Sequence, residues 1–211
     1  MYIYIFGSTC RGELDQYSDI DLLAVHDFEE NIDHLDANKI SIYTENKLKK
    51  LWVTGNPFAW HLHLESKLVF SSDGTDFLRQ LGKPFKYTEG LNDCEKFYNI
   101  LKLSIESLKE DHLSLVYDLS TIFLCMRNIA TCYSLHIGKP IFSRESALLL
   151  PKHPLNIDRN IFHVLEKCRL ANTRGLHIDL TTSDIISTLN TLCMIRTWAR
   201  SLIEMINYDD F

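Results

Sequence analysis

The residues with the clearest chemical potential lie within the first 21 positions. Gly7 and Ser8 are followed by ten residues and then by Asp19-Ile20-Asp21. A Gly-Ser turn can offer backbone N–H groups and a hydroxyl to a triphosphate. Two aspartates that alternate along a strand share one face, about 7 Å apart, and can hold two divalent cations between them. Two such ions would stabilise the attacking oxygen and the departing pyrophosphate, so the pattern predicts metal-dependent phosphoryl transfer.

These residues need a strand–helix–strand frame to position them. Short β-rich runs predict strands over residues 2–6, 20–25, 40–43 and 67–70. We expect one helix from about Arg11 to the second strand and another over residues 45–65, with a break at Gly55-Asn56-Pro57-Phe58 that sets its angle. From residue 95 onward, apolar residues recur at helical spacing and predict amphipathic helices over about 95–109, 113–136, 157–170 and 183–206. The predicted class is α+β, a small mixed sheet followed by an all-α helical bundle.

The change of pattern near residue 85 predicts two domains. We place them at residues 1–85 and 86–211, with Gly82-Lys83-Pro84 as the hinge and a short tail at the end of the second. Residues 1–85 carry 8 Lys and Arg against 13 Asp and Glu, a net charge of −5, whereas residues 112–174 carry 8 against 4, a net of +4. This contrast either reflects two solvated faces or sets a metal-binding half beside a phosphate-binding half.

Composition narrows the class of protein. The 211 residues have a formal net charge of −6, which argues against a protein that coats duplex nucleic acid. The six cysteines include no C-x-x-C pair, and no apolar run approaches the roughly 18 residues of a membrane helix. The first residues also lack the features of a signal peptide. We therefore expect a cytoplasmic protein with reduced thiols and no membrane partner.

The segment FGSTCRGELDQYSDIDLLAV resembles the polymerase-β nucleotidyltransferase superfamily over roughly the first 80 residues. The resemblance implies a polymerase-β-like nucleotidyltransferase domain, in which Gly7 and Ser8 grip the nucleotide phosphates and Asp19 and Asp21 bind Mg²⁺ or Mn²⁺ as two ions. It also implies that Arg11 helps to bind phosphate.

The sequence departs from this superfamily at the third carboxylate, which is expected on the following strand. That strand reads KISIYTE, and its inward position is Ser41. Glu65, at the end of a predicted helix, is our candidate for the missing acid, with Glu45 as a weaker one. The alternative for Glu65 is a solvent-exposed helix end. His61 and His63, two residues apart, do not share a helix face, so we predict packing or polar-interface roles for them rather than a metal site.

The helical half offers candidate contacts to the triphosphate. Arg127, Lys139 and Arg144 flank a Gly-Lys-Pro turn, and the resemblance implies that such a helical domain closes over the nucleotide. The alternative is that these cations cap and solvate helix ends. Of the three, we take Lys139 and Arg144 as substrate-binding candidates.

The chain ends on a predicted polar tail over residues 207–211, which contains Tyr208, Asp209 and Asp210. A phenol is a competent nucleophile once its pKa falls from about 10, and a tail of five residues spans up to roughly 17 Å. Length, two-part layout and this tyrosine resemble the nucleotidyltransferases of bacterial Hailong anti-phage defence systems (HalB). That resemblance implies conversion of deoxy-ATP into single-stranded DNA oligomers primed on Tyr208, and a HalA-like effector protein as partner.

Two other functions stay open. A minimal nucleotidyltransferase would transfer one AMP to a hydroxyl of a protein or small molecule, as toxin–antitoxin and antibiotic-modifying enzymes do. A catalytically inactive nucleotide-binding module is the third hypothesis, because Ser41 stands where an acid is expected, although the Asp19 and Asp21 pair counts against it.

Overall fold

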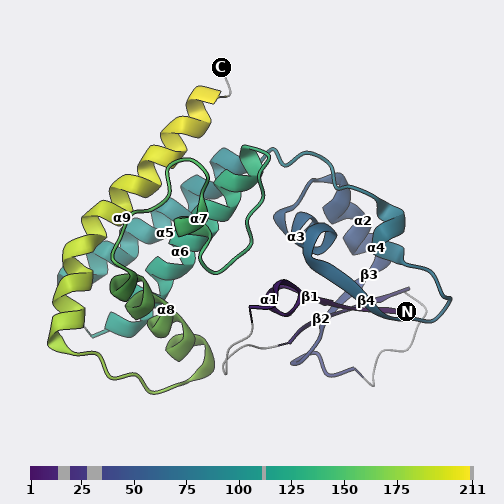
Figure 1. The fold of residues 1–211 in the computed structure, drawn as a ribbon, viewed down its shortest axis with the longest axis horizontal. Coiled ribbons are helices and arrows are strands. Elements are labelled where there is room, and N and C mark those ends of the chain that lie inside the picture. Colours follow the sequence, from purple (N-terminus) through teal and green to yellow (C-terminus); the bar gives the residue numbers. More distant parts are fainter. Residues whose placement is uncertain (14–19, 28–34, 111–112, 210–211) are drawn as a thin grey trace. The chain divides into compact units, whose positions relative to one another are not determined.

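The computed structural model describes residues 1–13, 20–27, 35–110 and 113–209. Its internal contacts divide the chain into two compact units, Met1–Thr88 and Glu89–Phe211 (Figure 1). The division falls three residues beyond the boundary expected from the sequence.

The segment that we expected to be the hinge is instead held on the first unit. The indole N–H of Trp52 donates to the carbonyl of Gly82 at 2.9 Å, and the indole N–H of Trp60 donates to the carbonyl of Phe85 at 3.0 Å. Tyr87 is buried. Two tryptophans, 30 and 25 residues away in sequence, therefore hold residues 82 and 85 on the first unit.

A four-stranded sheet forms the base of the first unit. Its strands are β1 (Tyr2–Phe6), β2 (Asp21–His26), β3 (Ser41–Thr44) and β4 (Ser66–Ser71), in the order β3-β2-β1-β4. β1 pairs antiparallel with β2 and β4, and β2 pairs parallel with β3. Each strand lies within one residue of its predicted bounds, because each is built on a short apolar run of the kind that predicts a strand.

Helices α2 (Glu45–Val53) and α3 (Pro57–Glu65) lie on the same side of this sheet (Figure 1). The alternating residues of β1 and β2 pack against apolar residues of these helices and of α4 (Phe77–Leu81) in one buried core. That core includes Tyr2, Tyr4, Phe6, Leu23, Val25, Leu48, Trp52, Ala59, Leu62, Phe77 and Leu78.

Two helix predictions need correction. The helix over residues 45–65 is two helices, because Gly55 has a φ of 62° and the side chain of Asn56 then caps α3 by accepting from the amide of Phe58. The break itself was predicted. The helix expected from about Arg11 begins earlier: α1 spans Ser8–Arg11 and ends there, because Gly12 adopts the left-handed conformation of a helix C-terminus. Residues 14–19 of the expected helix lie outside the described residues.

The second unit is built around α6 (Leu115–His136), which packs against α5 (Gly90–Glu110), α7 (Ser146–Leu149), α8 (Arg159–Arg174) and α9 (Thr182–Asp209). The four long helices follow the predicted pattern, and the short α7 was not predicted. In the described ranges, no helix combines the length and the apolarity needed to cross a membrane. The sheet unit followed by a helical unit confirms the α+β class.

The tail prediction was wrong at its start. α9 continues to Asp209, so Tyr208 lies in the last turn of a helix and not in an extended tail. Neither Asn207 nor Tyr208 breaks a helix, which explains the extension. Asp210 lies outside the described residues.

Candidate active site

The Gly7 turn and Asp21 meet at one end of the sheet. Phe6, the last residue of β1, pairs with Asp21, the first residue of β2. Gly7 follows with a φ of 70° and a ψ of −142°, a backbone conformation that residues other than glycine rarely adopt. A Cβ built on Gly7 would lie 2.6 Å from Oδ2 of Asp21. Only glycine therefore lets the Asp21 carboxylate lie this close to the turn.

The chain then enters α1 directly. The amides of Cys10 and Arg11 donate to the carbonyl of Gly7 at 3.0 and 3.3 Å. The amides of Ser8 and Thr9 belong to the first turn, where no intrahelical carbonyl can accept them. Such a turn has amide donors and the Ser8 hydroxyl with which an anion such as phosphate could bind, and phosphate binding here stays a prediction.

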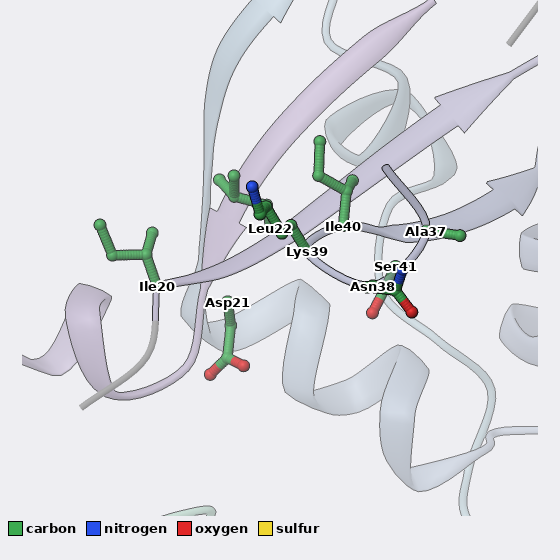
Figure 2. Close-up of a pocket in the computed structure, with 8 residues that line it drawn as sticks. All are labelled: Ile20, Asp21, Leu22, Ala37, Asn38, Lys39, Ile40 and Ser41. Atoms are coloured by element: carbon green, nitrogen blue, oxygen red, sulfur yellow. The ribbon is translucent and has the colours of Figure 1, made fainter. Parts of the chain in front are cut away.

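Asp21 also lines a pocket of about 540 Å³ together with Asn38, from the loop before β3, and Ser41, the first residue of β3. Figure 2 shows the Asp21, Asn38 and Ser41 side chains on one side of the sheet, opposite Ile20 and Leu22. Ser41 pairs with Leu23, two residues from Asp21, so its inward position is as predicted. Where an acid was expected, the structure therefore has two neutral polar side chains.

A cluster of charged side chains lies between α1 and α3. The Nη1 of Arg11 donates to Oε2 of Glu65, and its Nε donates to Oε2 of Glu13 at 2.8 Å. Nε2 of His61 lies 3.0 Å from the same Oε2 of Glu65. The side chains of Arg11, His61 and Glu65 are 17–20% exposed. Glu65 is therefore not the solvent-exposed helix end that was its alternative reading.

This environment changes the pKa of Glu65. Burial alone would raise it, but the hydrogen bond from His61 and the charge of Arg11 outweigh burial and lower the pKa below its ordinary value. Glu65 is therefore ionised at neutral pH. Because an ionised carboxylate only accepts hydrogen bonds, Nε2 of His61 is the donor in this contact.

The residues fit a divalent metal. Asp21 supplies the hard oxygen donors that Mg²⁺ prefers, while Asp19 lies outside the described residues. Within the described part of the chain, no three His, Cys, Asp or Glu side chains cluster as a metal cage. Mg²⁺ is usually bound by one or two carboxylates together with substrate phosphates, so the carboxylate of Asp21 and the phosphates of a bound nucleotide would form a sufficient set of ligands.

The structure brings together five of the predicted site residues in the first unit: Gly7, Ser8, Arg11, Asp21 and Glu65. Asp19 lies outside the described residues, and the other three lie in the second unit. Lys139 is exposed, Arg144 pairs with Glu166 at 3.2 Å, and the Tyr208 side chain is 81% exposed.

Two residues near the site were missed by the sequence analysis. His61 was compared only with His63, but its relation to Glu65 at i, i+4 on α3 places both on one helix face and could have been recognised. Asn38 carries no sequence signal, because its loop position depends on how β3 returns beside β2.

Comparison with known proteins shows the family of this chain. The nucleotidyltransferase domain family matches residues 2–147, well over half of the chain and past the end of the first unit. No curated protein sequence matches the chain. The crystal structure of the spectinomycin adenyltransferase AAD(9) from Enterococcus faecialis with ATP and spectinomycin is similar, with a TM-score of 0.46, 12% identity, and coverage of 95% of this chain and 91% of that one. So distant a likeness says nothing about the substrate of this chain. The family match, together with the Gly7 turn and Asp21, identifies the chain as a member of the nucleotidyltransferase domain family, a nucleotide-transferring enzyme.

Proposed function

We propose that this nucleotidyltransferase binds a nucleoside triphosphate on the Gly7-Ser8 turn, with a divalent cation held by Asp19 and Asp21. The observation that carries the proposal is the contact between Asp21 and Gly7, which sets a carboxylate against a turn of amide donors. Bound Mg²⁺ or Mn²⁺, as two ions, would neutralise the charge that develops on the phosphates. Around it, the amides of the turn and the Ser8 hydroxyl orient the triphosphate.

Glu65 is the proposed proton acceptor. In the transfer, an acceptor hydroxyl oxygen bonds to the α-phosphorus, the bond from this phosphorus to the bridging oxygen breaks, and pyrophosphate leaves. The hydroxyl proton passes to Glu65, which its neighbours keep ionised and so able to accept it.

We further propose that the acceptor is Tyr208, and that successive transfers from deoxy-ATP build single-stranded DNA oligomers that serve as a signal in anti-phage defence, with a HalA-like effector as partner. The support is the resemblance described above and the exposure of the Tyr208 phenol, which makes it accessible for modification.

One observation favours a second candidate. Because Tyr208 belongs to the last turn of α9, it lacks the reach of an extended tail. An external hydroxyl, on a protein or a small molecule, would then accept a single AMP. This reaction needs the same site in the first unit and ignores Tyr208.

Intact-protein mass spectrometry separates the two. The protein is incubated with Mg²⁺ or Mn²⁺ and each common nucleoside triphosphate, beside Asp21→Asn and Tyr208→Phe, with Tyr117→Phe as the control for an exposed tyrosine. Self-priming predicts a ladder of nucleotide-sized additions with deoxy-ATP that both site variants abolish and the control keeps. An unmodified mass together with pyrophosphate release would contradict priming on Tyr208 and favour an external acceptor.

A further inference from the structure

We propose that Arg11 and His61 are positioning residues that hold the Glu65 carboxylate beside the Gly7 turn, and that Arg11 is not a phosphate ligand. This inference rests on the proposed function, in which Glu65 accepts the proton of the attacking hydroxyl. It gives a role to His61, for which the sequence predicted only packing or a polar interface.

Arg11 and His61 converge on one oxygen of Glu65. Arg11 from α1 and His61 from α3 both contact Oε2 of Glu65. Their side chains are mostly buried, so the contacts are shielded from solvent. We call Arg11 and His61, with the Glu65 oxygen that they share, the clamp. Because Oε2 takes both contacts, Oε1 lies outside the clamp and is the oxygen that would accept the proton.

Carboxylates surround the guanidinium of Arg11. Its guanidinium lies between the carboxylates of Glu13 and Glu65, which together carry one more negative charge than the guanidinium balances. An arginine placed in this way has its Nε and Nη1 donors committed to carboxylates and not directed at a triphosphate. The same contacts suit a residue that fixes two carboxylates, since the guanidinium has its donors in a rigid fork.

His61 is connected through Phe6 to the Gly7 turn. The ring of His61 meets the ring of Phe6 edge-on, with centroids 5.6 Å apart. Phe6 precedes Gly7 and pairs with Asp21. The clamp is therefore packed against the strand that sets the turn, and a shift of His61 moves Glu65 relative to Asp21. Displacement of a catalytic group by about 1 Å can lower a rate about 100-fold.

The test uses the full chain with two pairs of variants. Arg11→Leu and His61→Leu remove the contacts, whereas Arg11→Lys and His61→Gln keep a donor. Matched controls are Arg79→Leu, on the exposed surface of α4, and His63→Leu, which lies on α3 but meets the ring of Trp60. Pyrophosphate release gives kcat and KM for the triphosphate, and a non-hydrolysable analogue gives Kd without turnover.

Positioning predicts a kcat lowered about 10- to 100-fold in both leucine variants, with KM and Kd within about twofold of wild type. The lysine and glutamine variants should recover most of the rate, and the controls should match wild type. In a Glu65→Gln background, a second change at His61 should cause no further loss, because the group that it positions is gone.

Contrary results would separate the two proposals. An active wild type in which Arg11→Leu raises KM and Kd about tenfold at unchanged kcat would make Arg11 a phosphate ligand and overturn only this inference. An equal loss from His61→Leu with and without Glu65 would also overturn it. A wild type that releases no pyrophosphate with any triphosphate would remove the proposed function and the clamp together.

Discussion

At the scale of single residues, Gly7 combines two properties that no other residue can supply. Its φ of 70° and its closeness to Oδ2 of Asp21 both exclude a side chain. The lack of a Cβ on Gly7 thus leaves room for the Asp21 carboxylate beside the turn, and any side chain at position 7 would displace it.

Replacement of Gly7 by alanine should therefore damage the site more than the fold. We expect Gly7→Ala to lower nucleotidyl transfer about 100-fold through displacement of Asp21, and the free energy of unfolding by about 1–3 kcal/mol. Gly74→Ala is the control, since Gly74 has a φ of 76° but open space where its Cβ would lie. If both variants lost the same stability and neither lost activity, the contact with Asp21 would not matter.

Glu65 should make stability depend on pH in a defined direction. Its folded pKa lies below the ordinary value of about 4.3, so its stabilisation is complete above that pH and is lost as pH falls through the folded pKa. Glu65→Gln should reduce the free energy of unfolding by about 1–3 kcal/mol at neutral pH, and the difference should shrink below about pH 4. Urea unfolding across pH 3–7 measures it. A difference that grows towards acid would contradict the assignment.

Gly7, Ser8 and Asp21 were predicted to lie together, because the alternation of side chains along a strand directs Asp21 towards the space above the Gly-Ser turn. The convergence of Arg11 and His61 on Glu65 could not be predicted in full. It requires knowing that α1 ends at Gly12 and that α3 starts a turn after α2, and both depend on local backbone geometry.

At the scale of elements, β1 carries the site at its end and the core along its length. The hydroxyl of Tyr4, buried in β1, donates to Oδ1 of Asp76 at 2.9 Å and accepts from the amide of Leu78 at 3.0 Å. Burial, partly offset by the Leu78 amide, raises the pKa of Tyr4 above its ordinary value, so the hydroxyl remains a donor. Tyr4 thus links β1 to the start of α4.

Tyr4→Phe should leave the buried amide of Leu78 without this acceptor, while Oδ1 of Asp76 keeps only the amide of Arg79. We expect a loss of about 1–3 kcal/mol in the free energy of unfolding, since buried polar groups without partners pay their desolvation. Tyr43→Phe on β3 removes a hydroxyl that touches neither partner and should change stability by less than about 0.5 kcal/mol. Chemical denaturation of the two variants compares them, and equal losses would refute the role of this linkage.

The strands were predictable because a short run of apolar, β-forming residues is a local signal. The lengths of the helices were less so. Gly55 and Asn56 divide a segment whose apolar spacing continues across the break, and α9 runs past Ile206 because nothing in its sequence stops it.

At the scale of the whole molecule, the helical unit buries four of the six cysteines. Cys94, Cys125, Cys132 and Cys168 are buried, whereas Cys193 is exposed and Cys10 is half-buried. Burial raises the pKa of Cys125 to about 12 and that of Cys168 to about 11. These thiols are therefore protonated and unreactive in the folded state.

Thiol labelling should report on the integrity of this unit. In the native protein at pH 8 we expect Cys193 to react fast and the four buried thiols to react only after unfolding. Cys193→Ser should abolish the fast phase, as absorbance of released thionitrobenzoate would show. Fast labelling of a buried thiol in the native protein would mean that the helical unit opens.

The two-unit organisation followed from the change of apolar period, but the exact boundary did not. Trp52 and Trp60 hold residues 82–85 through contacts that are distant in sequence. The family match also extends beyond the roughly 80 residues over which the sequence resemblance was recognised. The resemblance stopped there because the helices that follow carry no comparable motif.

Nucleotidyl transfer should depend on the carboxylate of Asp21 beside the Gly7 turn. The most direct measurement is pyrophosphate release from nucleoside triphosphates with Mg²⁺, by wild type, Asp21→Asn and the exposed control Asp179→Asn. We predict release by wild type and the control, with a fall of at least about 100-fold in Asp21→Asn. Equal release by all three proteins would contradict the account.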